Sequence, residues 1–101
     1  MIFSTLELDL PEIADVHVSE DTLAIDLADG RSLSVPLAGY PRLLSGAPAE
    51  RSHGELIGRG HGIHWSQLDE DISIANLLAG QQSAESPNAF KRWFTTREKA
   101  A

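Results

Sequence analysis

Between Ile13 and Val35, hydrophobic residues alternate with polar ones at a period of two along three successive segments. Such alternation is typical of β-strands that bury one face and expose the other. Asp29-Gly30 separates the last two segments and predicts a two-residue hairpin turn, because glycine readily takes the positive φ that the turn requires. We therefore expect a three-stranded antiparallel meander with one apolar face that the rest of the chain must cover. Its apolar positions are Val16, Val18, Leu23, Ile25, Leu27, Leu33 and Val35.

Short helices are predicted after the meander. Pro41 favours a helix over residues 41–44, because the missing N–H of proline costs nothing at the first helical position. Pro48 predicts another helical turn, although Ala47 before it has no side-chain oxygen to cap it. The segment 55–57 is long enough only for a short strand that returns to the sheet. The predicted class is α+β, with a small antiparallel β-sheet (a three-strand meander plus one or two returning strands) covered by short helices.

Residues 58–80 combine glycines, an aromatic strand-like segment and a helix start. Ile63-His64-Trp65 has the alternation of a half-buried strand. Ser73 is placed as the N-cap of a helix over residues 74–79, and Gly80 follows where a glycine commonly ends a helix. The acids at 69–71 precede this helix, where negative charge complements the helix dipole.

The two ends of the chain differ from its middle. Leu6, Leu8 and Leu10 alternate with acids, which indicates an edge strand or a lead-in segment. We expect one α+β domain over residues 1–80, then a polar linker and a C-terminal amphipathic helix within residues 81–101. The helix would place Phe90, Trp93 and Phe94 on one side. That stripe would cover its own domain, swap onto a second copy, or bind a partner.

Composition restricts the classes of function. The formal charge is −7, and residues 1–85 carry 14 acidic against 4 basic side chains, so direct binding to nucleic acid is not expected. Residues 86–101 are basic, with 4 basic side chains and 1 acidic. The chain has no cysteine, no apolar run long enough to span a bilayer and no basic start of a signal peptide, so a cytoplasmic location is expected.

His61-x-x-His64, followed by Asp69 and Asp71, raises the possibility of metal chemistry. Positions three apart in an extended segment point to opposite faces, so we expect neither a metal site nor a cofactor here. An enzyme or metal-binding protein centred on His64 and Asp71 is kept as an alternative.

Over about residues 12–80 the chain carries a series of short segments in a specific order: Asp29-Gly30-Arg31, Val35-Pro36-Leu37, Tyr40-Pro41-Arg42-Leu43-Leu44, Leu56-Ile57-Gly58, Gly62-Ile63-His64-Trp65, Leu68-Asp69-Glu70-Asp71-Ile72-Ser73 and Leu77-Leu78 with Gly80. Together these segments resemble the prokaryotic family catalogued as domain of unknown function 2442. Ala47, Gly54 and Ser66 depart from the pattern of that family, and Gly54 stands where a large aromatic residue is common. The resemblance implies a small α+β domain without an assigned reaction, often encoded beside another small protein as the antitoxin-like member of a toxin–antitoxin pair.

We therefore predict a non-enzymatic protein-interaction module that binds a small toxin-like protein or a second copy of itself. A regulator that reaches DNA only as a dimer or with its partner is a weaker alternative, and no membrane partner is expected. The predicted partner-binding surface comprises Arg59, His61, His64, Trp65, Asp69, Glu70 and Asp71, with Phe90, Trp93 and Phe94 as tail contacts.

Overall fold

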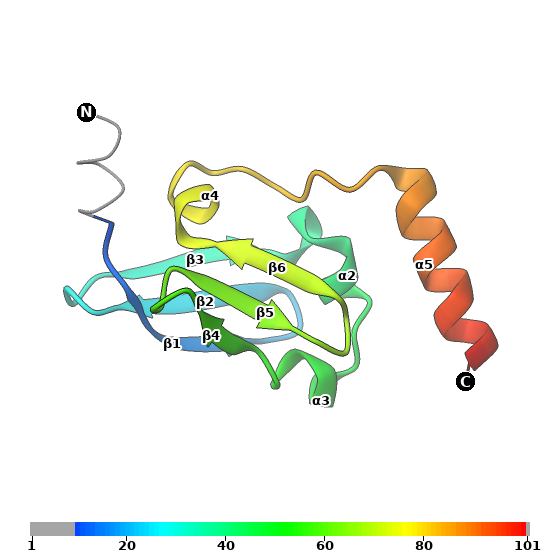
Figure 1. Cartoon of the computed structure of the whole chain (residues 1–101), viewed down its shortest axis with the longest axis horizontal. Coiled ribbons are helices and arrows are strands. Elements are labelled where there is room, and N and C mark those ends of the chain that lie inside the picture. The colour runs from blue at the N-terminus through cyan, green and yellow to red at the C-terminus, as the bar shows by residue number, and fades with distance from the viewer. Residues whose placement is uncertain (1–9, 101) are drawn as a thin grey trace.

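A three-stranded antiparallel sheet begins the fold, as the alternating segments predict (Figure 1). The computed structural model describes residues 10–100, and the predicted edge strand around Leu6 and Leu8 lies outside this range. Strands β1 (Ile13–Val18), β2 (Thr22–Leu27) and β3 (Ser32–Pro36) pair in the order β1-β2-β3. Val16 lies opposite Ile25, and Leu23 opposite Val35, so their apolar side chains share one face. Gly30, with φ of 96°, lies in the predicted turn, but residues 28–31 separate the two strands, so the turn is longer than the two residues predicted.

Three short helices connect this sheet to the next part of the chain. The 3-10 helix η1 (Leu37–Gly39) was not predicted, whereas α2 (Pro41–Leu44) and α3 (Pro48–Arg51) begin at the expected prolines. Ala47 offers no cap to α3, but the carboxylate of Glu50 accepts a 2.8 Å hydrogen bond from the backbone N–H of Ala47. The helix therefore has half of a capping box.

A second three-stranded antiparallel sheet follows, formed by β4 (Glu55–Ile57), β5 (Gly62–Trp65) and β6 (Glu70–Ser73) in that order. The α+β class is confirmed, but the returning strands form this separate sheet instead of extending the meander. The acids at 69–71 were expected to act as a helix lead-in, and that interpretation is corrected here. Glu70 and Asp71 are strand residues opposite Trp65 and His64, and Asp69 has φ of 50° in the preceding turn.

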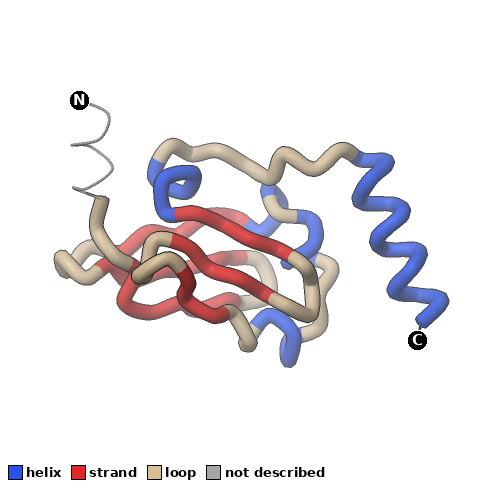
Figure 2. Tube along the Cα trace, viewed as in Figure 1, coloured by secondary structure: helices blue, strands red, loops and turns tan. Residues whose placement is uncertain are grey.

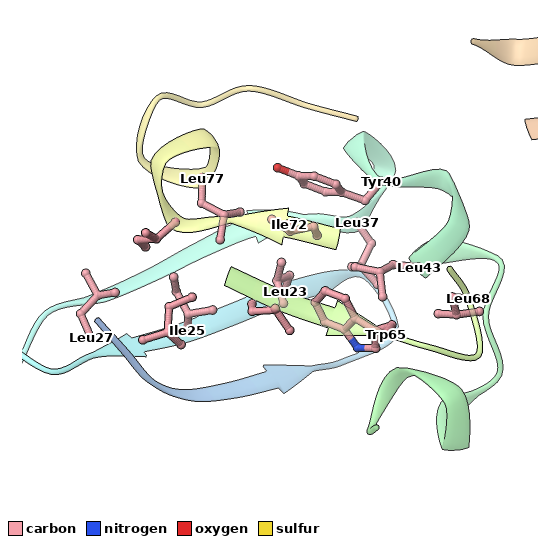
Figure 3. Close-up of a cluster of buried hydrophobic side chains, with 13 residues drawn as sticks. Leu23, Ile25, Leu27, Leu37, Tyr40, Leu43, Trp65, Leu68, Ile72 and Leu77 are labelled. Atoms are coloured by element: carbon pink, nitrogen blue, oxygen red, sulfur yellow. The ribbon is translucent and has the colours of Figure 1, made fainter. Parts of the chain in front are cut away.

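The hydrophobic core lies between the two sheets (Figure 3). Leu23 and Ile25 of the first sheet and Ile63 and Trp65 of the second are almost completely buried. Side chains from the helical connection and from α4 (Ile74–Leu78) complete the cluster. Each sheet thus covers the apolar face of the other. The buried residues are Ile13, Leu23, Ile25, Leu27, Leu37, Tyr40, Leu43, Ile63, Trp65, Leu68, Ile72, Ile74 and Leu77.

Helix α4 begins at Ile74 and is capped by Ser73, whose hydroxyl accepts a 3.1 Å hydrogen bond from the N–H of Asn76, and this confirms the predicted cap. After Gly80, an extended segment leads to α5 (Pro87–Ala100), which lies beyond one end of the two sheets (Figures 1 and 2). No helix of residues 10–100 combines the length and the apolar character needed to cross a membrane.

Candidate functional site

The predicted partner-binding residues do not share one location. His64 and Asp71 lie next to each other on paired strands, whereas Asp69 lies in the β5–β6 turn. Arg59 lies in the β4–β5 turn, at the other end of β5.

Trp65 belongs to the core, so its inclusion in a binding surface is corrected. The ring is fully buried, and its Nε1 donates a 3.0 Å hydrogen bond to the backbone oxygen of Arg51. Gly54 lies against the same ring, because a Cβ at that position would come within 2.7 Å of the Trp65 Nε1. A large aromatic residue at position 54 could not fit beside Trp65 as it is placed here.

The outer face of the second sheet carries a row of three polar side chains. His64 lies on the middle strand, opposite Glu55 of β4 and Asp71 of β6. The Nδ1 atom of His64 is hydrogen-bonded to the carboxylate of Asp71. His64 is partly exposed and both acids are exposed, so this row is an acidic, solvent-facing surface with an oriented imidazole at its centre.

Asp69 and Glu70 turn instead toward Arg42 of α2. The Arg42 guanidinium donates a 3.1 Å hydrogen bond to the backbone oxygen of Asp69 and lies 3.5 Å from its carboxylate. One oxygen of Glu70 is buried without a hydrogen-bond partner among residues 10–100, and burial raises the pKa of the Glu70 carboxyl. The three consecutive acids therefore have different roles, because alternation along the strand sends Glu70 and Asp71 to opposite faces.

A hollow of about 540 Å³ lies beside Glu70. Its walls come from β6, from Tyr40 and from the segment that follows Gly80. The Tyr40 hydroxyl donates a 2.7 Å hydrogen bond to the backbone oxygen of Gln81, which holds that segment in place. Burial, and then the charge of Glu70, raise the pKa of the Tyr40 hydroxyl.

Arg59 and His61 lie in a tight turn between β4 and β5. Gly58, Arg59 and Gly60 all have positive φ, of 58°, 58° and 81°. The Gly60 oxygen accepts a 2.7 Å hydrogen bond from the N–H of Ile13, and the His61 oxygen accepts one of 2.8 Å from the N–H of Ile74. The backbone of the turn thus binds both β1 of the first sheet and the start of α4, and Arg59 itself is exposed.

The C-terminal helix docks on its own domain through Trp93. The Arg42 guanidinium lies 4.9 Å from the centre of the Trp93 ring, and that of Arg97 lies 4.8 Å from it. Arg97 also forms an ion pair with Glu50 of α3. Arg42 is bound in addition by the carboxylate of Glu85, which precedes the helix. The contact between Arg97 and Trp93 lies within the helix, so one cation–π contact, from Arg42, and two ion pairs attach the tail to the body.

The other two predicted tail residues have a different role. Phe90 and Phe94 stack on each other with ring centres 5.9 Å apart, and Phe94 remains 39% exposed. Trp93 is the aromatic residue of this tail that packs against the hydrophobic core.

The β4 strand was not among the predicted site residues. Leu56 and Ile57 are each 43% exposed, on a strand at the edge of its sheet whose three residues are all exposed. The sequence signal for this surface was present: two adjacent large aliphatic residues in a three-residue strand cannot both point to one face.

Comparisons with known proteins agree with this fold. The model of a family described as a protein of unknown function, DUF2442, matches residues 13–83. A crystal structure of a protein of unknown function from Rhodospirillum rubrum is similar, with 27% identity and a TM-score of 0.64, over 74% of this chain and 93% of that one. The solution structure of the uncharacterised protein CV0863 from Chromobacterium violaceum is also similar, with 22% identity and a TM-score of 0.67, over 80% of this chain and 76% of that one. No curated protein matches the sequence.

Proposed function

Because the chain belongs to the DUF2442 family, whose description assigns no activity, we propose its function from its surface: it is a non-enzymatic protein-interaction module that binds its partner along β4. The observation that carries this proposal is the exposure of Leu56 and Ile57 on an edge strand. An edge strand offers backbone groups that a partner strand can pair with, and exposed aliphatic side chains beside it favour burial on binding.

The chemistry around β4 indicates what the partner is like. Glu55 belongs to the strand, and the Asp71 carboxylate lies in the same row on the outer face. The body up to residue 85 carries 14 acids against 4 basic side chains. A basic, partly apolar segment of another protein matches this surface in charge. An antitoxin-like pairing with a small protein encoded nearby is the form of this proposal that the family resemblance favours.

The test uses the full chain and the product of the adjacent gene. The two proteins are expressed together, and their affinity is measured by calorimetry for the wild type and for Leu56→Ser combined with Ile57→Ser. Losing the burial of both side chains should cost about 2 kcal/mol, which corresponds to about 30-fold in Kd. Leu78→Ser is the matched control, because Leu78 on α4 is 40% exposed and lies away from β4 in sequence and fold.

Equal affinity of the β4 variant and the wild type would contradict the proposed surface. Failure of the adjacent gene product to bind at all would contradict the antitoxin-like pairing. Circular dichroism of each variant checks that the fold is retained.

One observation supports a second candidate, an enzyme centred on His64 and Asp71. The Nδ1 atom of His64 is hydrogen-bonded to the carboxylate of Asp71. This arrangement orients an imidazole as a general base. Among the hydrogen bonds of the described residues, none joins a hydroxyl to the Nε2 of His64. The Ser73 hydroxyl, on the neighbouring strand, is engaged in capping α4. Hydrolysis of a generic ester substrate that is lost in His64→Ala would support this alternative over the interaction module.

A further inference from the structure

The outer face of the first sheet brings one imidazole and two carboxylates together. His17 Nε2 lies 3.0 Å from an oxygen of Asp15 and 3.9 Å from an oxygen of Asp26. One ligand atom from each residue lies within 4.8 Å of the other two. This group is distant in sequence from the histidines at 61 and 64, which were the residues considered for metal chemistry from the sequence.

Strand pairing explains why these side chains meet. Asp15 and His17 are two residues apart on β1 and therefore point to the same face. An irregularity between Ile13 and Asp15 shifts the register, so that Asp15 lies directly opposite Asp26 of β2. Ala24, which has a small side chain, lies opposite His17.

Two carboxylates that face each other across neighbouring strands repel each other. The second oxygen of each acid is already engaged: Asp15 Oδ1 accepts from the backbone N–H of Val16, and Asp26 Oδ1 accepts from the Ser32 hydroxyl, both at 2.8 Å. These donors fix the orientation of both carboxylates and leave the Oδ2 atoms directed toward His17. A cation between the three groups would relieve the repulsion.

We propose that Asp15, His17 and Asp26 bind a divalent transition-metal ion of the zinc type. Tetrahedral zinc with bonds of about 2.0 to 2.2 Å holds its ligand atoms about 3.3 to 3.6 Å apart. The distances from His17 Nε2 to Asp15 and to Asp26, 3.0 Å and 3.9 Å, lie on either side of that range. One imidazole with two carboxylates favours zinc over magnesium or calcium, which prefer oxygen ligands alone. The three side chains are more than half exposed, so the ion reaches them directly and water completes its coordination.

The donors around the cluster support this assignment. Metal-binding carboxylates are commonly held by hydrogen bonds from neighbouring groups, as Val16 and Ser32 hold Asp15 and Asp26 here. Coordination through Nε2 places the remaining ring proton of His17 on Nδ1. Metal binding requires a neutral imidazole and ionised carboxylates, so the affinity for zinc depends on pH.

The experiment is a calorimetric titration of the full chain, without a histidine tag, with zinc chloride at neutral pH, and with magnesium chloride in parallel. We expect saturable binding of one zinc ion per chain and no comparable binding of magnesium. His17→Ala and Asp26→Asn should each weaken zinc binding about tenfold or more. His64→Ala is the matched control, because it removes another histidine that is hydrogen-bonded to an aspartate, and it should leave the zinc affinity within about twofold.

A second measurement locates the ion. Zinc should shift the backbone amide resonances of residues 15–17 and 24–26 and leave those of the second sheet unchanged. The proposal is overturned if zinc does not saturate at one ion per chain, if His17→Ala binds it as tightly as the wild type, or if His64→Ala abolishes binding. Circular dichroism shows whether each variant retains the fold, as expected for substitutions of side chains that are more than half exposed.

Discussion

The guanidinium of Arg42 lies over the ring of Trp93, 4.9 Å from its centre. One residue belongs to the small α+β body and the other to the C-terminal helix, 51 positions further along the chain. In this structure the aromatic-basic tail lies against its own chain. The contact also makes the tail a measurable part of the stability of the body.

Truncation of Trp93 should therefore destabilise the fold. Trp93→Ala removes both cation–π contacts and the packing on the core, and should lower the free energy of unfolding by about 1 to 2 kcal/mol. Phe94→Ala is the control, because Phe94 is an exposed aromatic residue of the same helix. Urea denaturation measures the free energy of unfolding of both variants. Deletion of residues 86–101 should also lower the melting temperature. An unchanged melting temperature of the Trp93 variant would mean that the tail is free to bind a partner.

Neighbouring residues of β5 should differ widely in their effect on stability. Trp65→Ala removes a fully buried ring and its hydrogen bond to the Arg51 oxygen, and should cost about 3 to 5 kcal/mol. His64→Ala removes a partly exposed side chain and should cost less than about 1 kcal/mol. Chemical denaturation compares the two directly. Small and equal losses would show that Trp65 is not part of the core.

The missing cap of α3 offers a stabilising substitution. Ala47 already has the extended backbone of an N-cap, with φ of −71° and ψ of 156°, and its N–H already binds the Glu50 carboxylate. Ala47→Ser adds the hydroxyl that completes the capping box and should raise the free energy of unfolding by about 1 kcal/mol. Ala75→Ser, on the exposed side of α4, is the control and should not stabilise. A melting temperature of the Ala47 variant at or below that of the wild type would contradict the prediction.

Acid should weaken the attachment of the tail through Glu50. The hydrogen bond from Arg97, and then that from the Ala47 N–H, lower the pKa of the Glu50 carboxyl below its ordinary value of 4.5. A lowered folded-state pKa contributes stability that is present above 4.5 and is lost as the pH falls through the folded-state pKa. The difference in melting temperature between wild type and Glu50→Gln should therefore shrink as the pH is lowered below 4.5. A constant difference would show that the charge of Glu50 is not involved.

Glu70 should show the opposite dependence. Burial raises the pKa of its carboxyl, so the folded state holds the proton more tightly than the unfolded state. The stability that this contributes is present below the ordinary pKa of 4.5 and is lost as the pH rises through the folded-state pKa. Glu70→Gln should consequently melt at a higher temperature than the wild type near neutral pH and lose this advantage in acid. The measurement is a pair of thermal scans at the two pH values, and a less stable variant at neutral pH would contradict the prediction.

Several parts of this protein were predictable because the signal is local. Alternation at a period of two specifies which side of a strand is apolar, and this identified the meander and the inward positions from Leu23 to Val35. Turn and cap chemistry acts over two to four residues, and this identified Gly30, the helix starts at Pro41 and Pro48, and the cap at Ser73. The order of these elements also carried the family resemblance.

The candidate sites were less predictable because they depend on which strands pair and in what register. Pairing of β6 with β5 divides three consecutive acids between Arg42 and His64, and it turns Glu70 inward. A shift at the start of β1 places Asp15 against Asp26. Strand pairing is decided by the packing of the whole core, since a slip of one residue exchanges the two faces of a strand. The sequence by itself thus determined the faces, turns and helix starts of this protein, and only the tertiary structure decided which charged side chains became neighbours.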